Sequence, residues 1–149
     1  MLGNLLKTSS VWHTIPLRLV LGLVFLGHGG QKVFGWFGGP GLQKVTEMFA
    51  SMGFSPVMAA LAAYGEFFGG LLILLGLLTR FGALTLAIIM LVAIFKVHWG
   101  KFFLPEGFEY AFTLLGISLS LLISGGGALS MDLCLEKKLP CCKKEDATS

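Results

Sequence analysis

The residues best suited to chemistry in this sequence lie inside or beside long apolar runs. His28, Gln31 and Lys32 follow one another at spacings of three and four, which places them on one face of a helix. Glu66 lies near the middle of a second apolar run, where an ionisable side chain in lipid costs about 2.5–3.5 kcal/mol unless it faces protein or water. These side chains can exchange protons, hold a small anion or pair with one another.

Further candidates border a third and a fourth apolar run. Lys96 and His98 end the third run, and Glu109 opens the fourth. If the runs are antiparallel helices, all of these residues except the deeper Glu66 lie in one half of a bundle, where they can meet only around a shared pocket. The candidate pocket residues are therefore His28, Gln31, Lys32, Glu66, Lys96, His98 and Glu109.

Structural roles explain the same residues, and these alternatives stay open. Glu66 can pair with Lys32 or Lys96 and fix the register of two helices. His28 can form a hydrogen bond between helices, and Lys96 and Lys101 can extend along apolar surface until their charges reach the membrane interface.

The composition indicates which solvent surrounds these side chains. Of the 149 residues, 55% are hydrophobic and 13% are charged, whereas a soluble domain is about one quarter charged. A chain this short cannot hide so much apolar surface from water, because small domains bury only about two thirds of their surface. The composition excludes a soluble enzyme, a disordered chain and a conventional nucleic-acid binder. It indicates a protein whose main partner is the lipid bilayer.

Four apolar runs reach or approach the length of about 20 residues that a transmembrane helix needs. They cover residues 15–34, 56–78, 81–97 and 110–123. We therefore predict an all-α fold, an integral membrane four-helix bundle with antiparallel, up-and-down spans. Residues 1–132 are expected to form this membrane domain, and residues 133–149 a polar, basic tail.

The segment between the first two runs predicts a loop and a short helix. Residues 35–41 are rich in glycine, proline and aromatic side chains, which is typical of a loop. Apolar side chains then recur at helical spacing at Leu42, Val45, Phe49 and Met52. We expect a short interfacial helix here, lying on the membrane surface.

Basic residues predict the orientation, because they are in excess on the cytoplasmic side of membrane proteins. With four spans, both termini lie on one side together with Lys7, Arg18, Arg80, Lys137, Lys138, Lys143 and Lys144. The opposite side holds Lys32, Lys44, Lys96 and Lys101. Both termini are thus expected in the cytoplasm, with Arg18 and Arg80 anchoring that side and attracting anionic lipid.

Small residues predict which helix faces pack together. Glu66 shares one face of its run with Ala59, Ala62, Gly69, Ile73 and Gly76, and small residues let membrane helices approach closely. On the fourth run, Glu109, Thr113, Gly116 and Ser120 share a face, and their hydroxyls are expected to bond across helices.

Other cofactor chemistry has little basis in the sequence. Cys134, Cys141 and Cys142 lie in the tail without the spacing of a metal site, so no metal site is predicted. His28 and His98 alone do not favour a haem between helices. The cofactor is left unassigned, with a quinone as the candidate.

Several short segments, in chain order, resemble the signature of the DoxX family. They are Arg18-Leu19 with Gly22-Leu23-Val24-Phe25, His28-Gly29, Gln31-Lys32 and Phe34-Gly35-Trp36-Phe37-Gly38-Gly39, then Glu66-Phe67-Phe68-Gly69-Gly70 and Gly76-Leu77-Leu78-Thr79-Arg80, then His98, Gly100 and Gly107-Phe108-Glu109-Tyr110, and finally residues 125–132, which end in Ser130-Met131-Asp132. The resemblance implies a small bacterial inner-membrane protein of four helices. Its signature polar residues would be His28, Gln31, Lys32, Glu66, Arg80, His98, Glu109 and Asp132.

The resemblance also suggests a function. Some members of the family are linked to thiosulfate oxidation with quinone as acceptor, or to membrane complexes with a sulfurtransferase and superoxide dismutase. We therefore expect a redox-associated component linked to quinone or to thiosulfate and thiols, and whether it is itself an enzyme stays open. One alternative is a non-catalytic anchor that recruits soluble redox or sulfurtransferase-type proteins. Another is a small transporter, which would have to be a homo-oligomer.

Overall fold

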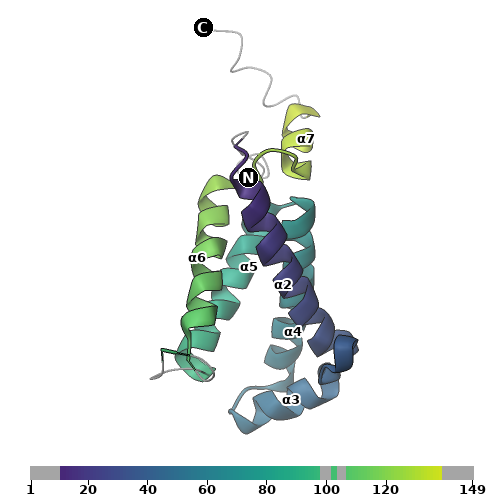
Figure 1. Ribbon diagram of the computed structural model, residues 1–149. Helices are drawn as coiled ribbons and strands as arrows, with labels where there is room; N and C mark the ends of the chain where they lie inside the picture. Colours follow the sequence, from purple (N-terminus) through teal and green to yellow (C-terminus); the bar gives the residue numbers. More distant parts are fainter. Residues whose placement is uncertain (1–10, 98–101, 104–106, 139–149) are drawn as a thin grey trace, which may run out of the picture.

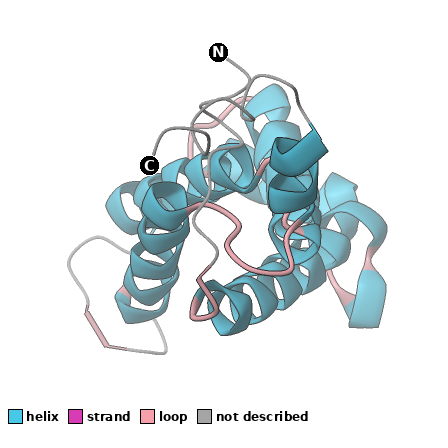
Figure 2. Cartoon of the chain, turned by 90° about the horizontal axis from the view of Figure 1, so that it is seen from above, coloured by secondary structure: helices cyan, strands magenta, loops and turns pink. Residues whose placement is uncertain are grey.

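The computed structural model describes residues 11–97, 102–103 and 107–138. This part of the chain is helical and contains no strand, as Figure 2 shows. The elements, labelled in Figure 1, are α2 (Thr14–Phe34), the 3₁₀ turn η1 (Trp36–Gly38), α3 (Gly41–Ser51), α4 (Pro56–Leu75), α5 (Thr79–Val92), the π-helical turn η2 (Ala93–Val97), α6 (Glu109–Ser124) and α7 (Met131–Lys138). The prediction of an all-α fold is confirmed.

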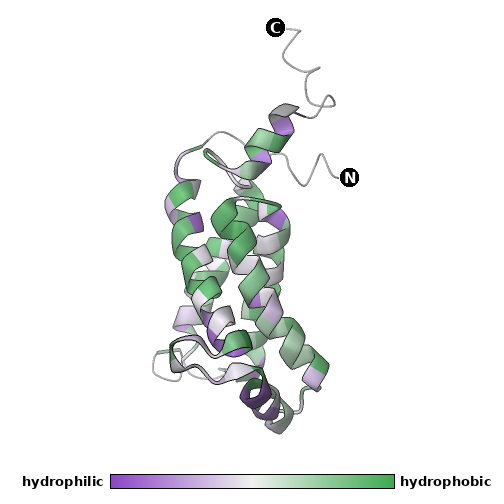
Figure 3. Ribbon diagram, turned by 90° about the vertical axis from the view of Figure 1, so that its right-hand side faces the viewer, coloured by the Kyte–Doolittle hydropathy of each residue, from purple (hydrophilic) through white to green (hydrophobic). Residues whose placement is uncertain are grey.

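Two of the described helices are long and apolar enough to cross a membrane. They are Pro56–Leu75 and Thr79–Val97, and Glu109–Ser124 is apolar but shorter. Figure 3 shows mainly hydrophobic helices between α3 and α7, which lie at opposite ends and carry more hydrophilic residues. The charged residues of the described chain are thus concentrated towards the two ends.

Glycines bring α2 and α4 into close backbone contact. A Cβ added to Gly29 would collide with the backbone of Phe67, and one added to Gly70 would lie 2.6 Å from the backbone nitrogen of Leu26. A Cβ added to Gly22 would lie 2.9 Å from the Cβ of Leu74. Side chains at these glycines would push the helices apart, so the glycines fix the distance between α2 and α4.

The remaining helices complete a buried apolar core. Leu21 and Phe25 of α2 meet Ile73 of α4, Leu86 of α5 and Leu121 of α6, and all five are almost completely buried. On α4, the face predicted from small residues is the packed one, since Ala59, Glu66, Gly69, Ile73 and Gly76 are all buried. This places Glu66 inside the protein.

Arg18 closes the end of the molecule at which the described chain begins. Its side chain is only 5% exposed, and it donates hydrogen bonds to backbone carbonyls at the end of α4 and in the loop before α7. The acceptors are Ile73, Leu74, Gly126, Ala128 and Leu129. The prediction that Arg18 attracts lipid headgroups is therefore wrong, because backbone carbonyls occupy its donors.

Asp132, near the start of α7, contacts the turn between α4 and α5. Its carboxylate accepts hydrogen bonds from the backbone nitrogens of Leu78 (2.7 Å) and Thr79 (2.9 Å) at the start of α5. Leu78 has a φ of 47°, a left-handed conformation that is strained for a leucine. The negative charge at this helix N-terminus stabilises both the helix and the strained turn.

Arg80 acts in a similar way at the end of α6. It donates to the carbonyls of Leu122 (3.0 Å) and Ile123 (2.8 Å), which are among the last of that helix. Arg80 is partly buried rather than extended into solvent. It thus joins the start of α5 to the end of α6.

The packed face of α6 differs from the predicted one. Thr113, Gly116 and Ser120 are exposed, and the Thr113 hydroxyl donates to the carbonyl of Glu109 in its own helix (2.9 Å). The prediction that this face bonds across helices is therefore wrong. The buried residues are Ala111, Leu114, Leu115, Ser118 and Leu121. Larger apolar side chains bury more surface, and a threonine hydroxyl can bond within its own helix.

A short helix, α3, forms where the sequence predicted one, and its position at the membrane surface stays a prediction. Ser55 caps α4 by accepting a hydrogen bond from the backbone nitrogen of Met58 (3.3 Å). In α3, Val45 is buried while Lys44 and Glu47 are exposed, so this helix packs on one side. The loop at residues 35–41 contains the short turn η1.

Candidate functional site

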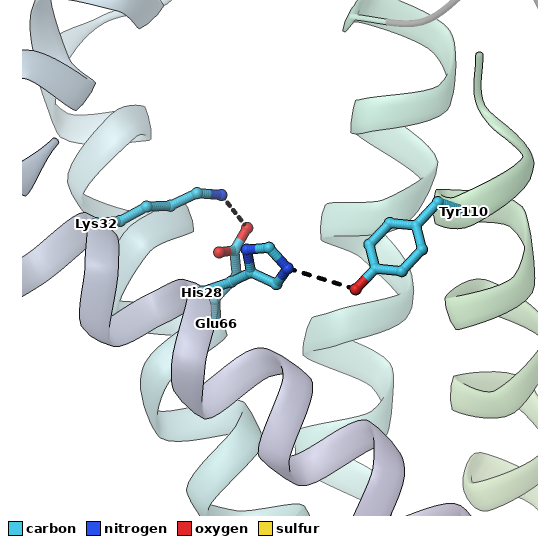
Figure 4. Close-up of polar contacts among 4 residues, drawn as sticks. All are labelled: His28, Lys32, Glu66 and Tyr110. Carbon is cyan, nitrogen blue, oxygen red and sulfur yellow. Dashed lines mark hydrogen bonds and ion pairs between the residues drawn. The ribbon is translucent and has the colours of Figure 1, made fainter. Parts of the chain in front are cut away.

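The centre of the candidate site is an ion pair between α2 and α4. Lys32 Nζ lies 2.5 Å from Glu66 Oε1, and the Glu66 side chain is only 4% exposed, compared with 27% for Lys32 (Figure 4). Glu66 is ten residues beyond Pro56, which at 1.5 Å per residue is about 15 Å along the helix. The sequence left two partners open for Glu66, and the structure selects Lys32.

The other carboxylate oxygen of Glu66 has no hydrogen-bond partner among the residues that the structure describes. Oε2 is buried, and no donor of these residues lies within hydrogen-bond distance of it. Buried polar atoms are nearly always paired, and an unsatisfied one costs about 1–3 kcal/mol, more when it is charged. Glu66 Oε2 is therefore an acceptor that the described side chains leave unsatisfied.

An aromatic cluster lies close in sequence to the two charged residues. Phe34, Trp36 and Phe67 form a cluster with ring centroids 5.2–5.7 Å apart. Phe34 is two residues after Lys32, and Phe67 directly follows Glu66. The cluster therefore joins the end of α2 to the middle of α4 beside the ion pair.

A second polar contact connects α2 to α6. The Tyr110 hydroxyl lies 3.4 Å from His28 Nε2, and their ring centroids are 6.2 Å apart (Figure 4). Both side chains are exposed, and 3.4 Å is long for a hydrogen bond. His28 lies one helical turn before Lys32 on α2. These four residues therefore form one polar group across three helices.

The two lysines near this group differ in their partners. Lys32 pairs with Glu66, and Lys96 is exposed at the end of η2 without an ion pair to any residue that the structure describes. Binding of a small anion by Lys32 stays a prediction.

The remaining candidate residues of the predicted pocket lie in different parts of the structure. Gln31 packs beneath the loop at Gly39, where a Cβ would lie 2.6 Å from the Cβ of Gln31. Glu109 is partly buried, and its backbone nitrogen donates to the carbonyl of Phe102 (3.0 Å). His98 and Lys101 lie outside the described residues. The role of any candidate in ligand binding stays a prediction.

Tyr110 is the residue that the sequence analysis missed. An aromatic side chain at the start of an apolar run is typical of the membrane interface, so nothing singled it out. Tyr110 directly follows the candidate Glu109 on α6, and His28 was expected to bond to another helix. Together these two points were the available signal for Tyr110.

Comparison with known proteins identifies the family. The sequence profile of the DoxX family matches residues 13–99, more than half of the chain. The chain belongs to the DoxX family. The matched region contains Arg18, His28, Lys32 and Glu66, so three of the four residues of the polar group lie within it.

Two curated DoxX-type relatives align over most of the chain. One, named "Inner membrane protein YqjF" from Escherichia coli (strain K12), is 36% identical over 126 residues, 81% of this chain and 90% of that protein. The other, named "Putative oxidoreductase CatD" from Bacillus subtilis (strain 168), is 30% identical over 119 residues, 80% of this chain and 84% of that protein. No solved structure matches the chain. The chain is thus a DoxX membrane protein with a distant relative named as an oxidoreductase.

Proposed function

We propose that this DoxX protein is a multi-pass protein of the bacterial inner membrane in which α2, α4, α5 and α6 cross the bilayer. The apolar lengths of α4 and α5 support this arrangement, as does the relative named as an inner membrane protein. The carbonyl of Val11 accepts a hydrogen bond from Ala128 (3.0 Å), so the start of the described chain lies beside the α7 end. The excess of basic residues places that end in the cytoplasm, and α3 then lies at the outer interface.

Within this arrangement, the polar group of His28, Lys32, Glu66 and Tyr110 binds the head group of a membrane quinone and gives the protein a redox-associated role. The observation that carries this proposal is the buried Oε2 of Glu66, which lacks a partner although its carboxylate is paired with Lys32. An uncharged ring with polar substituents can enter from the bilayer and reach such a site. The relative named as an oxidoreductase agrees with a redox role.

Each residue has a chemical task in this proposal. Glu66 Oε2 accepts a hydrogen bond from a hydroxyl of the ligand in its reduced form, and Lys32 holds the carboxylate through the ion pair. His28 and Tyr110, which are both exposed, exchange protons with the ligand or with water. A bound quinone would supply two-electron redox chemistry, which amino-acid side chains of this kind cannot supply. A partner protein must therefore deliver or remove the electrons.

Quinone extraction tests the proposal. The protein is purified in mild detergent, its lipids are extracted, and the quinone per protein is measured for the wild type, Glu66→Ala and Glu47→Ala. Glu47 is exposed on α3, so its substitution is the matched control. We expect quinone near one per protein in the wild type and the control and a loss of at least tenfold in Glu66→Ala. Background quinone in the wild type, with no binding of added quinone, overturns the proposal.

The position of α7 favours a second candidate, a membrane anchor that recruits soluble proteins. Asp132 and Ser130 attach the start of α7 to the bundle through hydrogen bonds to the turn at 76–79 and within the loop at 127–133. This attachment would hold a partner at a fixed position. Truncation after Asp132 should then abolish co-purification of the partner while the quinone content stays unchanged.

A further inference from the structure

We infer that the Glu66 site binds the reduced, hydroxyl-bearing form of its ligand more tightly than the oxidised, carbonyl-bearing form. This inference rests on the proposed function, because it assumes that a redox-active ligand occupies the site. It goes further, because it states which redox state the site favours and which residue sets the preference.

The preference follows from the hydrogen-bonding capacity of a carboxylate. An ionised carboxylate only accepts hydrogen bonds. Glu66 Oε1 faces Lys32, and Oε2 is buried without a donor. A hydroxyl on the ligand satisfies Oε2, whereas a carbonyl oxygen has no hydrogen to give and repels it.

The other polar side chains of the site do not discriminate between the two forms. Lys32 can donate to a carbonyl oxygen or to a hydroxyl oxygen, since both accept hydrogen bonds. The Tyr110 hydroxyl can both donate and accept, and the role of each His28 ring nitrogen depends on the tautomer. Glu66 is therefore the member of the group that distinguishes the reduced from the oxidised ligand.

The gain from a ligand hydroxyl follows from the acceptor that it meets. Oε2 belongs to a carboxylate that is paired with Lys32, so a hydroxyl of the ligand forms a hydrogen bond to a charged acceptor. Such a bond changes affinity on the order of ten- to a hundredfold.

Binding of a matched pair of probes tests the inference. Quinone-depleted protein in detergent is titrated under anaerobic conditions with a short-chain 1,4-benzoquinone and with the corresponding 1,4-benzoquinol. We expect the quinol to bind about ten- to a hundredfold more tightly to the wild type and to Glu47→Gln. In Glu66→Gln the preference should vanish or reverse, because the new amide can donate to a carbonyl oxygen.

The possible failures separate this inference from the proposed function. Equal affinity of the wild type for both probes, or tighter binding of the quinone, overturns the inference and leaves the proposed function standing. A preference for the quinol that persists in folded Glu66→Gln also overturns it. Binding of neither probe to the wild type overturns the proposed function, and the inference fails with it.

Discussion

Lys32 and Glu66 form an ion pair of 2.5 Å between α2 and α4, and the second oxygen of the same carboxylate is buried without a donor. A buried pair of this kind is rarely a net source of stability, because removing two charges from water is costly. The proposed function gives this ion pair a role in binding. The experiments below separate the structural part of that role from the chemical part.

Breaking the ion pair from one side should destabilise the protein more than removing both charges. Lys32→Met leaves the Glu66 carboxylate buried and unpaired, which should cost about 3–5 kcal/mol. The double variant Lys32→Met/Glu66→Met should recover most of this loss. Unfolding titrations with SDS in mixed micelles measure both values, with the exposed Glu47→Gln as the control. A double variant no more stable than Lys32→Met would contradict the interpretation.

The close contact between α2 and α4 should depend on Gly29. Gly29→Ala places a methyl group against the backbone of Phe67, and overpacking of this kind costs about 1–3 kcal/mol. Gly27→Ala on the same helix is the matched control, because nothing lies within 4 Å of its added Cβ. That variant should be unchanged or up to about 1 kcal/mol more stable, since alanine favours helix. Equal effects of the two substitutions in the same titration would refute the close approach.

Arg18 should not be replaceable by lysine. Its guanidinium donates to carbonyls at the end of α4 and in the loop at 126–129 at the same time. A lysine carries the charge but has a single nitrogen, so it cannot reach both sets. Arg18→Lys should lose at least about 2 kcal/mol. An Arg18→Lys variant as stable as the wild type would instead support the interpretation of Arg18 as a simple lipid anchor.

Reporter fusions test the proposed orientation in the membrane. A fluorescent protein fused after Ser149 should fold and fluoresce, because the proposed arrangement places the C-terminus in the cytoplasm. Alkaline phosphatase inserted after Gly53, in the exposed turn between α3 and α4, should be active, because that turn lies outside. An inactive phosphatase together with a non-fluorescent C-terminal fusion would show that the orientation is the opposite of the proposed one.

The sequence predicted those parts of the fold that depend on local patterns. The small residues beside Glu66 indicated the packed face of α4, on which Ala59, Gly69 and Ile73 are buried. Lys32 was one of two partners considered for Glu66. Helix positions and faces follow from periodicity within one segment, which is why these predictions are confirmed.

Contacts between distant segments were harder to predict. Arg18 resembled a surface anchor because its carbonyl partners come together only when α4 and the loop at 126–129 meet. Thr113 resembled a bridge between helices, yet its hydroxyl bonds within α6. Tyr110 was missed because its partner, His28, is 82 residues away in the sequence. Such choices depend on tertiary packing, which residue types alone do not determine.

Infrared difference spectroscopy tests the central claim most directly, that the Glu66 carboxylate contacts the redox-active ligand. Protein loaded with a short-chain 1,4-benzoquinone is reduced electrochemically, and the spectra before and after reduction are subtracted. The proposed contact predicts a shift in a carboxylate band that is absent in Glu66→Gln and present in Glu47→Gln. A spectrum with the ligand bands but no carboxylate change, or one that Glu66→Gln leaves unaltered, would contradict the claim.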